Sequence, residues 1–531
     1  MLLAALALAA PGIAHAGDSD LAAYLRARAA DAEGAERTAA AGYATALATD
    51  PGNAEIAIRA YRAGLAAGDM ALVRRARGVL EAAGVAPNDA PVLALSDALV
   101  AGDAAKIDTA VKAIDDSSFN FLSPSIRAWL APSSDAAATT AALDRARGNA
   151  LAGRFADHTR LLIDLAGGHV AQGDVLARLM TVSDPGAISL RIEAAQLLAG
   201  AGQRDAALAL LPADNDALAP YRAGLGAGVA PSPRLGVAWL YIQLAESLTD
   251  ARVAPAAIVL ARAAEQLDPG NDRARLALAR ALTNTRAPQM ALAVLDHIAP
   301  TSPAAAEAAD IRIAALQAAK RDVDALHIAA AISEAPGATS PDAQLYGDLL
   351  VAADRYDEAA KAYQTALTRA GKDADWTLHL QLGGALERAG QWRAGERELE
   401  TAVRLAPQSA VALNYLGYAR LEHGGAPAQA AKLLEQANAL QPNEPSIIDS
   451  LAWAYFRGGD TARALPLFEK AAASAPENAT INEHLGDAYW SLGRYYEARY
   501  AWRAAMVTAP SEDQPRLAAK IEAGPGAAAA R

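Results

Sequence analysis

The feature that most constrains this chain is a 34-residue sequence period near its C-terminal end. Eight positions recur at one spacing in two successive copies, as 485 − 451 = 34 shows for the leading leucines. The first copy is Leu451, Ala452, Tyr455, Gly459, Ala464, Phe468, Ala471 and Pro476, and the second is Leu485, Gly486, Tyr489, Gly493, Ala498, Trp502, Ala505 and Pro510. A fixed period of this length indicates a repeat architecture, in which each unit buries its apolar face against its neighbours.

Each copy has the pattern of two short helices joined by a turn. The glycine of each copy (459, 493) marks the turn, and the proline comes where the second helix must end, because proline cannot continue the hydrogen-bond ladder. Alanine and glycine recur where the two helices must approach closely. Large residues fill the space between them at helical spacing. These are Leu451, Tyr455, Phe468, Leu485, Tyr489 and Trp502.

This residue set at this period resembles the tetratricopeptide repeat (TPR) family. The resemblance implies an all-α fold, a right-handed α-solenoid of helix-turn-helix repeats. Helix-stopping residues extend the period with spacings of 34, 33, 35, 36, 35, 34 and 34, and they predict about eight repeats over residues 236–511. The stops are Pro269, Pro303, Pro336, Gly371, Pro407, Pro442, Pro476 and Pro510.

The rest of the chain divides around this array. Residues 17–225 carry a divergent version of the repeat, in which Ala39, Tyr43 and Ala46 match the second half of a unit. The Gly- and Pro-rich residues 226–235 predict a linker; the spaced glycines of this stretch lack the strand and spacing of a dinucleotide-binding loop. Residues 512–531 predict a cap helix over 514–523 and then a frayed tail.

Residues 1–16 have the pattern of a secretory signal peptide. An apolar run at residues 2–10 precedes the small-x-small site of Ala14 and Ala16. Cleavage after Ala16 implies a periplasmic or otherwise exported protein. No Lys or Arg precedes the run, so an upstream start or a buried first helix are the alternatives. No stretch is long and apolar enough to predict a transmembrane segment.

The composition argues against several functions. A net charge of −12 disfavours nucleic-acid binding, and the absence of cysteine excludes disulfides and thiolate metal sites. No P-loop, GxSxG or HExxH motif occurs, and the eight histidines are dispersed. His484 lies between Glu483 and Asp487 but is expected to point away from the helix face that these carboxylates share. The sequence therefore predicts a non-catalytic protein without cofactor or metal. The alternative is an enzyme site within residues 100–225, which requires a polar pocket with converging titratable groups.

The TPR resemblance also implies a binding groove for a protein or peptide, lined by the first helices of successive repeats. The positions two before, two after and five after the first core leucine face this groove. They are Asn414, Tyr418 and Leu421, then Asp449, Trp453 and Phe456, then Glu483, Asp487 and Trp490. Aromatic residues dominate binding hot spots, and the carboxylates would select basic partners. The alternative is that the rings pack against the neighbouring repeat.

The resemblance extends to a narrower group. Residues 413–418, 449–455 and 484–490 are similar to the C-terminal repeats of proteobacterial envelope TPR proteins, some of which are adaptors for a carboxyl-terminal processing protease. This implies a scaffold of the cell envelope, and an adaptor for a periplasmic protease is the most concrete version of that role. An assembly factor for outer-membrane or surface-polysaccharide machinery is the alternative. Asn414 matches the clamp that binds chaperone carboxylates, but no Lys or Arg joins it at the groove positions of the next two repeats.

Overall fold

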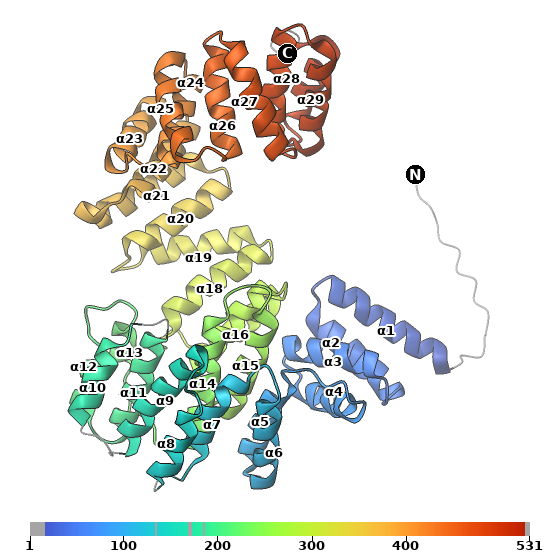
Figure 1. Ribbon diagram of the computed structural model, residues 1–531, viewed down its shortest axis with the longest axis vertical. Helices are drawn as coiled ribbons and strands as arrows, with labels where there is room; N and C mark the ends of the chain where they lie inside the picture. Colours follow the sequence, from blue (N-terminus) through green and yellow to red (C-terminus); the bar gives the residue numbers. More distant parts are fainter. Residues whose placement is uncertain (1–15, 133–134, 168–171, 184–185, 526–531) are drawn as a thin grey trace. The chain divides into compact units, whose positions relative to one another are not determined.

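The computed structural model describes residues 16–132, 135–167, 172–183 and 186–525. The regular structure of these residues is helical and contains no β-strand, which confirms the all-α prediction. The chain divides into two compact units, Met1–Ala325 and Leu326–Arg531 (Figure 1). The predicted signal peptide lies outside the described residues except for Ala16, the first residue of α1. Among the described helices, none combines the length and apolar character that crossing a bilayer requires.

The N-terminal part of unit 1 consists of three helix pairs. In α2 the buried side chains include Ala39, Tyr43 and Ala46, as expected for the second helix of a repeat. After the following turn, the side chain of Asn53 accepts hydrogen bonds from the backbone nitrogens of Glu55 and Ile56 and so caps the N-terminus of α3. The helices are α1 (Ala16–Ala32), α2 (Glu36–Thr49), α3 (Ala54–Ala67), α4 (Met70–Ala82), α5 (Ala90–Ala101) and α6 (Ala104–Asp115).

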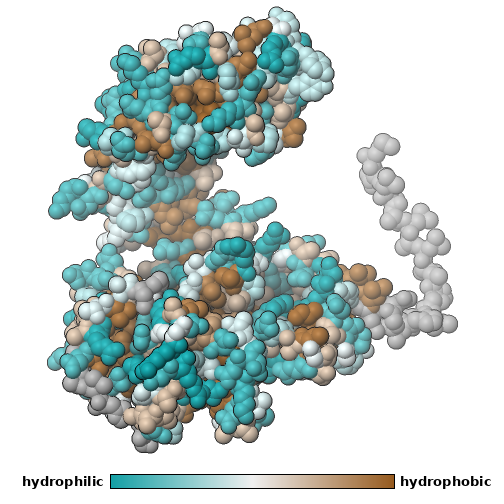
Figure 2. Space-filling view, viewed as in Figure 1, coloured by the Kyte–Doolittle hydropathy of each residue, from teal (hydrophilic) through white to brown (hydrophobic). Residues whose placement is uncertain are grey.

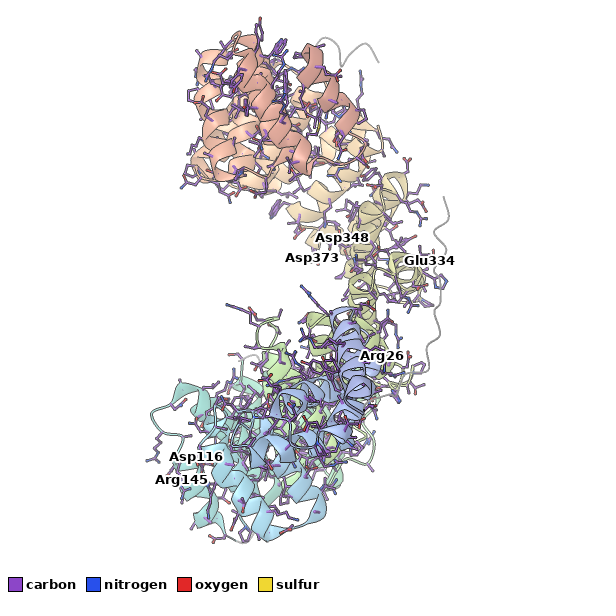
Figure 3. All side chains as sticks on the ribbon, turned by 90° about the vertical axis from the view of Figure 1, so that its right-hand side faces the viewer. Arg26, Asp116, Arg145, Glu334, Asp348 and Asp373 are labelled. Atoms are coloured by element: carbon purple, nitrogen blue, oxygen red, sulfur yellow. The ribbon has the colours of Figure 1, made fainter. Side chains whose placement is uncertain are left out.

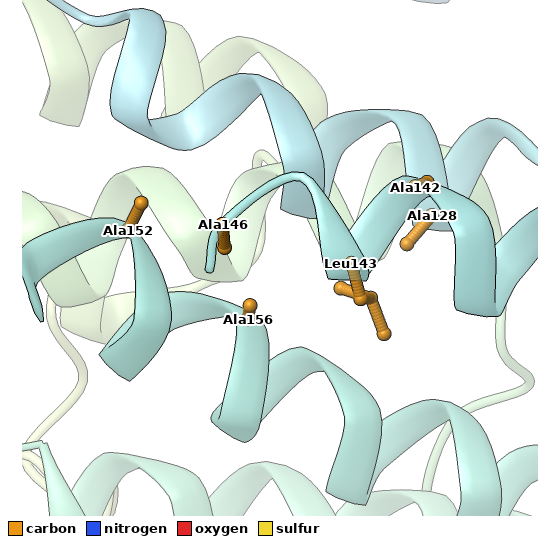
Figure 4. Close-up of a cluster of buried hydrophobic side chains, with 6 residues drawn as sticks. All are labelled: Ala128, Ala142, Leu143, Ala146, Ala152 and Ala156. Atoms are coloured by element: carbon orange, nitrogen blue, oxygen red, sulfur yellow. The ribbon is translucent and has the colours of Figure 1, made fainter. Parts of the chain in front are cut away.

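The middle of unit 1 is the region whose repeat register the sequence did not reveal. Its helices pack through small side chains: five alanines and Leu143 form one buried cluster where α7, α8 and α9 approach one another (Figure 4). The elements are η1 (Asn120–Leu122), α7 (Ser123–Leu130), α8 (Ala136–Asp144), α9 (Ala150–Gly167), α10 (Gln172–Thr181), α11 (Ala187–Gly200), α12 (Arg204–Leu210) and α13 (Ala219–Ala223).

Residues 226–235, for which a linker was predicted, pack inside unit 1. The backbone nitrogen of Val229 donates to the carbonyl oxygen of Gln196 in α11, over 3.0 Å. Gly228 has a positive φ of 72° and lies so close to the backbone of Gly200 that a Cβ would overlap it. Gly228 thus allows close packing, whereas a Cβ at Gly226 would meet open space. The division between compact units lies elsewhere, between Ala325 and Leu326.

The N-terminal repeats fold back onto the later helices of unit 1. Helix α5 packs along α15, and α7 packs on α14. The buried Arg262 of α15 donates through Nε to the carbonyl oxygen of Leu65, 3.1 Å away, and so satisfies the C-terminal end of α3. Gln266 reaches Asp97 in α5 over 2.7 Å. The later helices are α14 (Pro233–Ser247), α15 (Ala254–Leu267), α16 (Asp272–Asn284), α17 (Pro288–Leu295) and α18 (Ala305–Ala318), and α19 (Asp322–Glu334) contains the unit boundary.

Unit 2 is a regular succession of helix pairs. Its second helices end just before the predicted stops, for example α27 at Ser474, two residues before Pro476. Helix α30 spans the residues predicted to form a cap, whereas most of the predicted tail, 526–531, lies outside the described residues. The elements are α20 (Ser340–Ala352), α21 (Tyr356–Ala370), η2 (Gly371–Asp373), α22 (Trp376–Arg388), α23 (Trp392–Leu405), α24 (Ala410–Glu422), α25 (Pro427–Leu440), α26 (Pro445–Arg457), α27 (Thr461–Ser474), α28 (Ala479–Ser491), α29 (Tyr495–Thr508) and α30 (Gln514–Ala523).

In each helix pair of unit 2, a small residue on the first helix packs against a large residue on the second. A Cβ added to Gly347, Gly383 or Gly417 would lie only 2.6 to 2.8 Å from the facing side chain. The facing residues are Tyr363, Leu399 and Leu434, and Trp502 faces Gly486 in the same way. The α24–α25 turn is one residue longer (434 − 417 = 17, against 363 − 347 = 16), yet the contact is kept.

Two of the predicted core rings lie at the edge of the core. Tyr455 and Tyr489 are half-buried, and their hydroxyls donate to Glu435 and Glu469 over 2.7 and 2.8 Å. Burial, together with this hydrogen bond, raises the pKa of Tyr455 to about 12, so the hydroxyl remains a donor at neutral pH. Hydrophilic and hydrophobic side chains both occur on the viewed face of each unit (Figure 2).

The glycine contacts give a first prediction. Replacing Gly347 with alanine should lower the stability of unit 2 by about 1–3 kcal/mol, because the new methyl group overlaps the buried Tyr363 ring. Urea unfolding followed by circular dichroism measures this. Gly78→Ala is the control: this helical glycine has open space around a Cβ, so alanine should be neutral or stabilise by up to about 1 kcal/mol. Equal effects of the two substitutions would contradict the packing argument.

Candidate functional site

The predicted groove residues lie on three neighbouring first helices of unit 2, α24, α26 and α28. We call these residues the first-helix face: Asn414, Tyr418, Asp449, Trp453, Phe456, Glu483, Asp487 and Trp490. Helix α26 packs against both α24 and α28, so equivalent positions of consecutive repeats lie near one another. Leu421, also predicted to face the groove, is buried in the core instead, where it packs with Leu434 and Leu451.

The centre of this face is a buried polar contact between His484 and Asp449 of consecutive repeats. The imidazole Nδ1 of His484 lies 2.9 Å from Oδ2 of Asp449, and both side chains are buried. The indole of Trp453 stacks on the imidazole with ring centroids 4.0 Å apart and planes 12° apart. The prediction was that His484 points away from the helix face shared by Glu483 and Asp487, and the structure adds a partner that the sequence did not indicate. Although it avoids Glu483 and Asp487 on its own helix, it contacts the preceding repeat.

Trp453 also contacts its other neighbours on the face. Its Nε1 donates to Glu422 over 2.8 Å, and its ring stacks with Phe456 at a centroid distance of 5.4 Å. The guanidinium of Arg457 lies 5.5 Å from the ring centroid, within cation–π range. The indole is nevertheless only half-buried. Trp453 therefore combines a packing role with an accessible surface, so the two alternatives for this ring are not exclusive.

Acceptor oxygens without donors lie beside this ring system. Oδ1 of Asp449 and Oδ1 of Asn414 are both buried and have no hydrogen-bond partner. Burial raises the pKa of Tyr418, and the nearby carboxylates Glu422 and Asp449 raise it further. Buried polar atoms are almost always hydrogen-bonded in proteins, so unpaired acceptors indicate a place where a donor can bind.

The last repeat differs, because α30 covers its part of the first-helix face. Lys520 of α30 lies 2.6 Å from Glu483 and 2.7 Å from Asp487, and Arg516 also pairs with Glu483. Burial opposes ionisation of Glu483, but the hydrogen bonds from Arg516 and Lys520 hold its pKa below the usual value. Asp487 in addition accepts a hydrogen bond from Nε1 of Trp502 over 3.0 Å. These two carboxylates are thus neutralised within the chain.

Two further aromatic residues of the face are engaged in packing. Trp490 lies 4.4 Å from Tyr495 and 5.4 Å from Trp502, measured between ring centroids, and Gly524 after α30 lies against its ring. Phe456 meets Phe468 edge to face at 6.3 Å. The roles of all these residues in partner binding stay predictions; Tyr418 and Trp453 keep part of their surface accessible, whereas Asp449 is buried.

Sequence reasoning missed the contribution of His484. The available signal was its spacing from Asp449, 484 − 449 = 35, which is close to the repeat length and places both residues at similar positions of adjacent first helices. A His–carboxylate contact with a stacked Trp also occurs at a different position of the repeat, where His423 lies 2.9 Å from Glu387 and stacks on Trp392. Within the residues that the structure describes, no group of three His, Asp or Glu side chains is arranged to hold a metal ion.

Comparisons with known proteins agree with the repeat geometry. The Tetratricopeptide repeat family model matches residues 346–391, 380–445 and 450–514. A TPR repeat-containing protein of Pseudomonas aeruginosa is 26% identical over 142 residues, which are 27% of this chain. This chain spans only about a quarter (24%) of that relative's length.

Two solved structures each match about a third of this chain. A thermophilic TPR protein of Thermus thermophilus is 21% identical and matches with a TM-score of 0.31, over 34% of this chain and 97% of that protein. Pseudomonas aeruginosa pilF is 16% identical and matches with a TM-score of 0.30, over 34% of this chain and 82% of its own. Repeats of this family act as protein-interaction scaffolds. The 34-residue period and the packed helix pairs agree with the matched profile, so residues 346–445 and 450–514 of this chain are tetratricopeptide repeats.

Proposed function

We propose that this protein is a non-catalytic interaction scaffold of the bacterial cell envelope, and that its first-helix face binds a basic segment of a partner protein. The observation that carries the proposal is Oδ1 of Asp449, a buried carboxylate oxygen without a hydrogen-bond donor. A Lys or Arg side chain from a partner would supply this donor. The adjoining Tyr418 and Trp453 offer half-buried aromatic surface, the type that dominates binding hot spots.

The charge around this point favours a basic partner. Nearby carboxylates raise the pKa of the Tyr418 hydroxyl; they are Glu422, Asp449 and Glu483. In the last repeat, Glu483 stands at the position equivalent to Asp449 and, together with Asp487, already binds the ammonium group of Lys520 in α30. That contact shows the chemistry that such carboxylates accept on this face. Within the described part of the chain, Oδ2 of Asp449 contacts His484, whereas the buried Oδ1 has no hydrogen-bond partner.

The envelope location rests on the sequence. The signal-peptide pattern of residues 1–16 supports export, and the similarity of the C-terminal repeats to envelope TPR proteins supports the same compartment. The most concrete form of the proposal is an adaptor for a periplasmic protease, in which the bound basic segment belongs to the protease or its substrate. A partner identified as a protease or as its substrate would favour this form, whereas a component of polymer export would favour the assembly-factor alternative.

The substitution Asp449→Asn tests the proposal with little change of shape. The amide can still accept from His484, but it no longer attracts a cation, so partner binding should weaken about 10-fold or more. The partner is first captured from a native envelope extract with the wild-type protein and identified by mass spectrometry. Its dissociation constant is then measured for both proteins by calorimetry.

Asp373→Asn is the matched control. Asp373 lies exposed in η2 of the same unit (Figure 3), so its replacement removes an equal charge away from the first-helix face. This variant should bind like the wild type. If both variants, correctly folded, bind the partner with unchanged affinity, the first-helix face is not the binding site.

A further inference from the structure

A second candidate site lies in unit 1, away from the first-helix face. A cavity of about 430 Å³ opens between α11, α13, α14 and the start of α16. Its wall includes residues 224–229, the glycine-rich stretch predicted as a linker, together with Trp239. Pockets that bind small molecules commonly have volumes of about 300–1,000 Å³. The polar lining residues are Glu193, Gln196, Tyr221, Asp268, Asn271, Asp272, Arg273 and Ser302.

Glu193 is the unusual residue of this cavity. Its side chain is only 1% exposed. One carboxylate oxygen, Oε2, accepts a hydrogen bond of 2.5 Å from Nε2 of Gln243, but the other, Oε1, is buried without a hydrogen-bond partner. The nearest cationic atom is Nη1 of Arg273, which lies 3.6 Å from Oε1 and makes no hydrogen bond to it. Leaving a buried acceptor of this kind without a hydrogen-bond donor costs free energy, because the atom has lost its contacts with water.

Arg273 does not neutralise Glu193, because it is paired with another carboxylate. Its Nε and Nη2 lie 3.1 and 2.5 Å from the two oxygens of Glu246, and Nη2 also contacts the hydroxyl of Ser189. Asp272 has its own partner in Arg275, 2.6 Å away. When Glu193 and Glu246 are both ionised, the single positive charge of Arg273 leaves the network with one uncompensated negative charge.

We propose that this cavity binds a small organic cation, whose ammonium or guanidinium group donates to Oε1 of Glu193 and whose carbon skeleton packs against Trp239 and Tyr221. The glycine-rich wall is therefore not a phosphate loop, because the charge next to it is negative. The polar pocket lies partly in the region, residues 100–225, where the sequence left room for converging titratable groups. The arrangement is a binding site: it provides an orienting carboxylate and an apolar wall.

Proton uptake should be coupled to this binding. Burial raises the pKa of Glu193 to about 8, against the opposing effect of Arg273, so the free protein holds a proton on Glu193 below that pH. The charged or titratable groups around Glu193 are Arg273 and Glu246, with Tyr221 and Asp272 in the cavity wall and His158 beyond Gln243. A cation binds the ionised carboxylate, so affinity should rise about 10-fold per pH unit below pH 8 and level off above it.

Calorimetric titration of the full-length protein tests the inference. The probes are 1,4-diaminobutane, phenethylamine and butylguanidine, and their neutral counterparts are 1,4-butanediol and 2-phenylethanol. Amines of this type remain charged to about pH 10, as lysine does. We expect the cations to bind at pH 8.5, more weakly at pH 6.5, and the alcohols not to bind. Absence of cation binding at pH 8.5, or equal binding of amine and alcohol, would overturn the proposal.

Two variants locate the site. Glu193→Gln keeps the shape of the side chain and should abolish both cation binding and its pH dependence, whereas Asp373→Asn should change neither. Gly226→Leu should weaken binding without touching the carboxylate network, because a Cβ at Gly226 has open space and a larger side chain there narrows the cavity. Thermal unfolding confirms that each variant is folded. Cation binding that survives Glu193→Gln or Gly226→Leu unchanged would place the bound cation elsewhere.

Discussion

Replacing Arg273 with alanine should lower the free energy of unfolding of unit 1 by about 3–5 kcal/mol. Arg273 is buried and holds Glu246 in a two-atom ion pair, close to the equally buried Glu193. Removing the guanidinium leaves two carboxylates in a poorly solvated environment without a cation. Breaking one side of a buried ion pair is far more destabilising than losing an exposed one, because the remaining charge keeps its full desolvation cost.

The loss of unfolding free energy caused by replacing Arg273 should depend on pH. Without the guanidinium, both carboxylates can avoid the penalty by binding protons, so the destabilisation should be smaller near pH 5 than near pH 8. Urea unfolding at the two pH values, with hydrogen exchange of peptides from α11, α14 and α16, measures the effect. Arg252→Ala is the control: its ion pair with Asp250 is exposed to solvent, and its loss should cost less than about 1 kcal/mol. Equal losses for the two arginines would show that the buried network contributes little.

The second large effect is expected from Trp502→Ala in the last repeat. Trp502 is fully buried, faces Gly486, and donates through Nε1 to Asp487. The substitution should cost about 3–5 kcal/mol, since it removes a large buried side chain and leaves a cavity. It also removes the donor that helps to hold Asp487 in place for Lys520, so α30 should detach more readily.

The consequences of Trp502→Ala should be confined to one end of the chain. In repeat arrays each unit contacts mainly its neighbours, so the last repeat can unfold while earlier ones persist. Hydrogen exchange should therefore increase in α28, α29 and α30 and change little in α20 to α23. Trp502→Phe, which keeps an aromatic ring, should show a smaller loss. Uniform destabilisation of unit 2 by Trp502→Ala would indicate that its repeats unfold as one cooperative body.

The candidate face illustrates how far repeat periodicity carries a site prediction. Because equivalent positions recur every 34 or 35 residues, the sequence could assign Asn414, Asp449 and Glu483 to one row of helices. It could not assign their partners. The contact of Asp449 with His484 and the ion pair of Glu483 with Lys520 each join residues of different helices, whose side-chain directions depend on how the helices pack.

The sequence by itself determined the repeat unit of this protein. Apolar residues at helical spacing, a glycine at the turn and a proline after the second helix specify the helix pair locally, so unit 2 follows its period closely. Only the tertiary structure decided how unit 1 is organised. Arg262 donates a hydrogen bond to the carbonyl oxygen of Leu65, near the end of α3 and 197 residues away in the sequence. Glu193 shares one buried network with Gln243 and Arg273. Contacts between distant segments leave no fixed spacing in the sequence, and their energetics depend on burial, which only the folded chain defines.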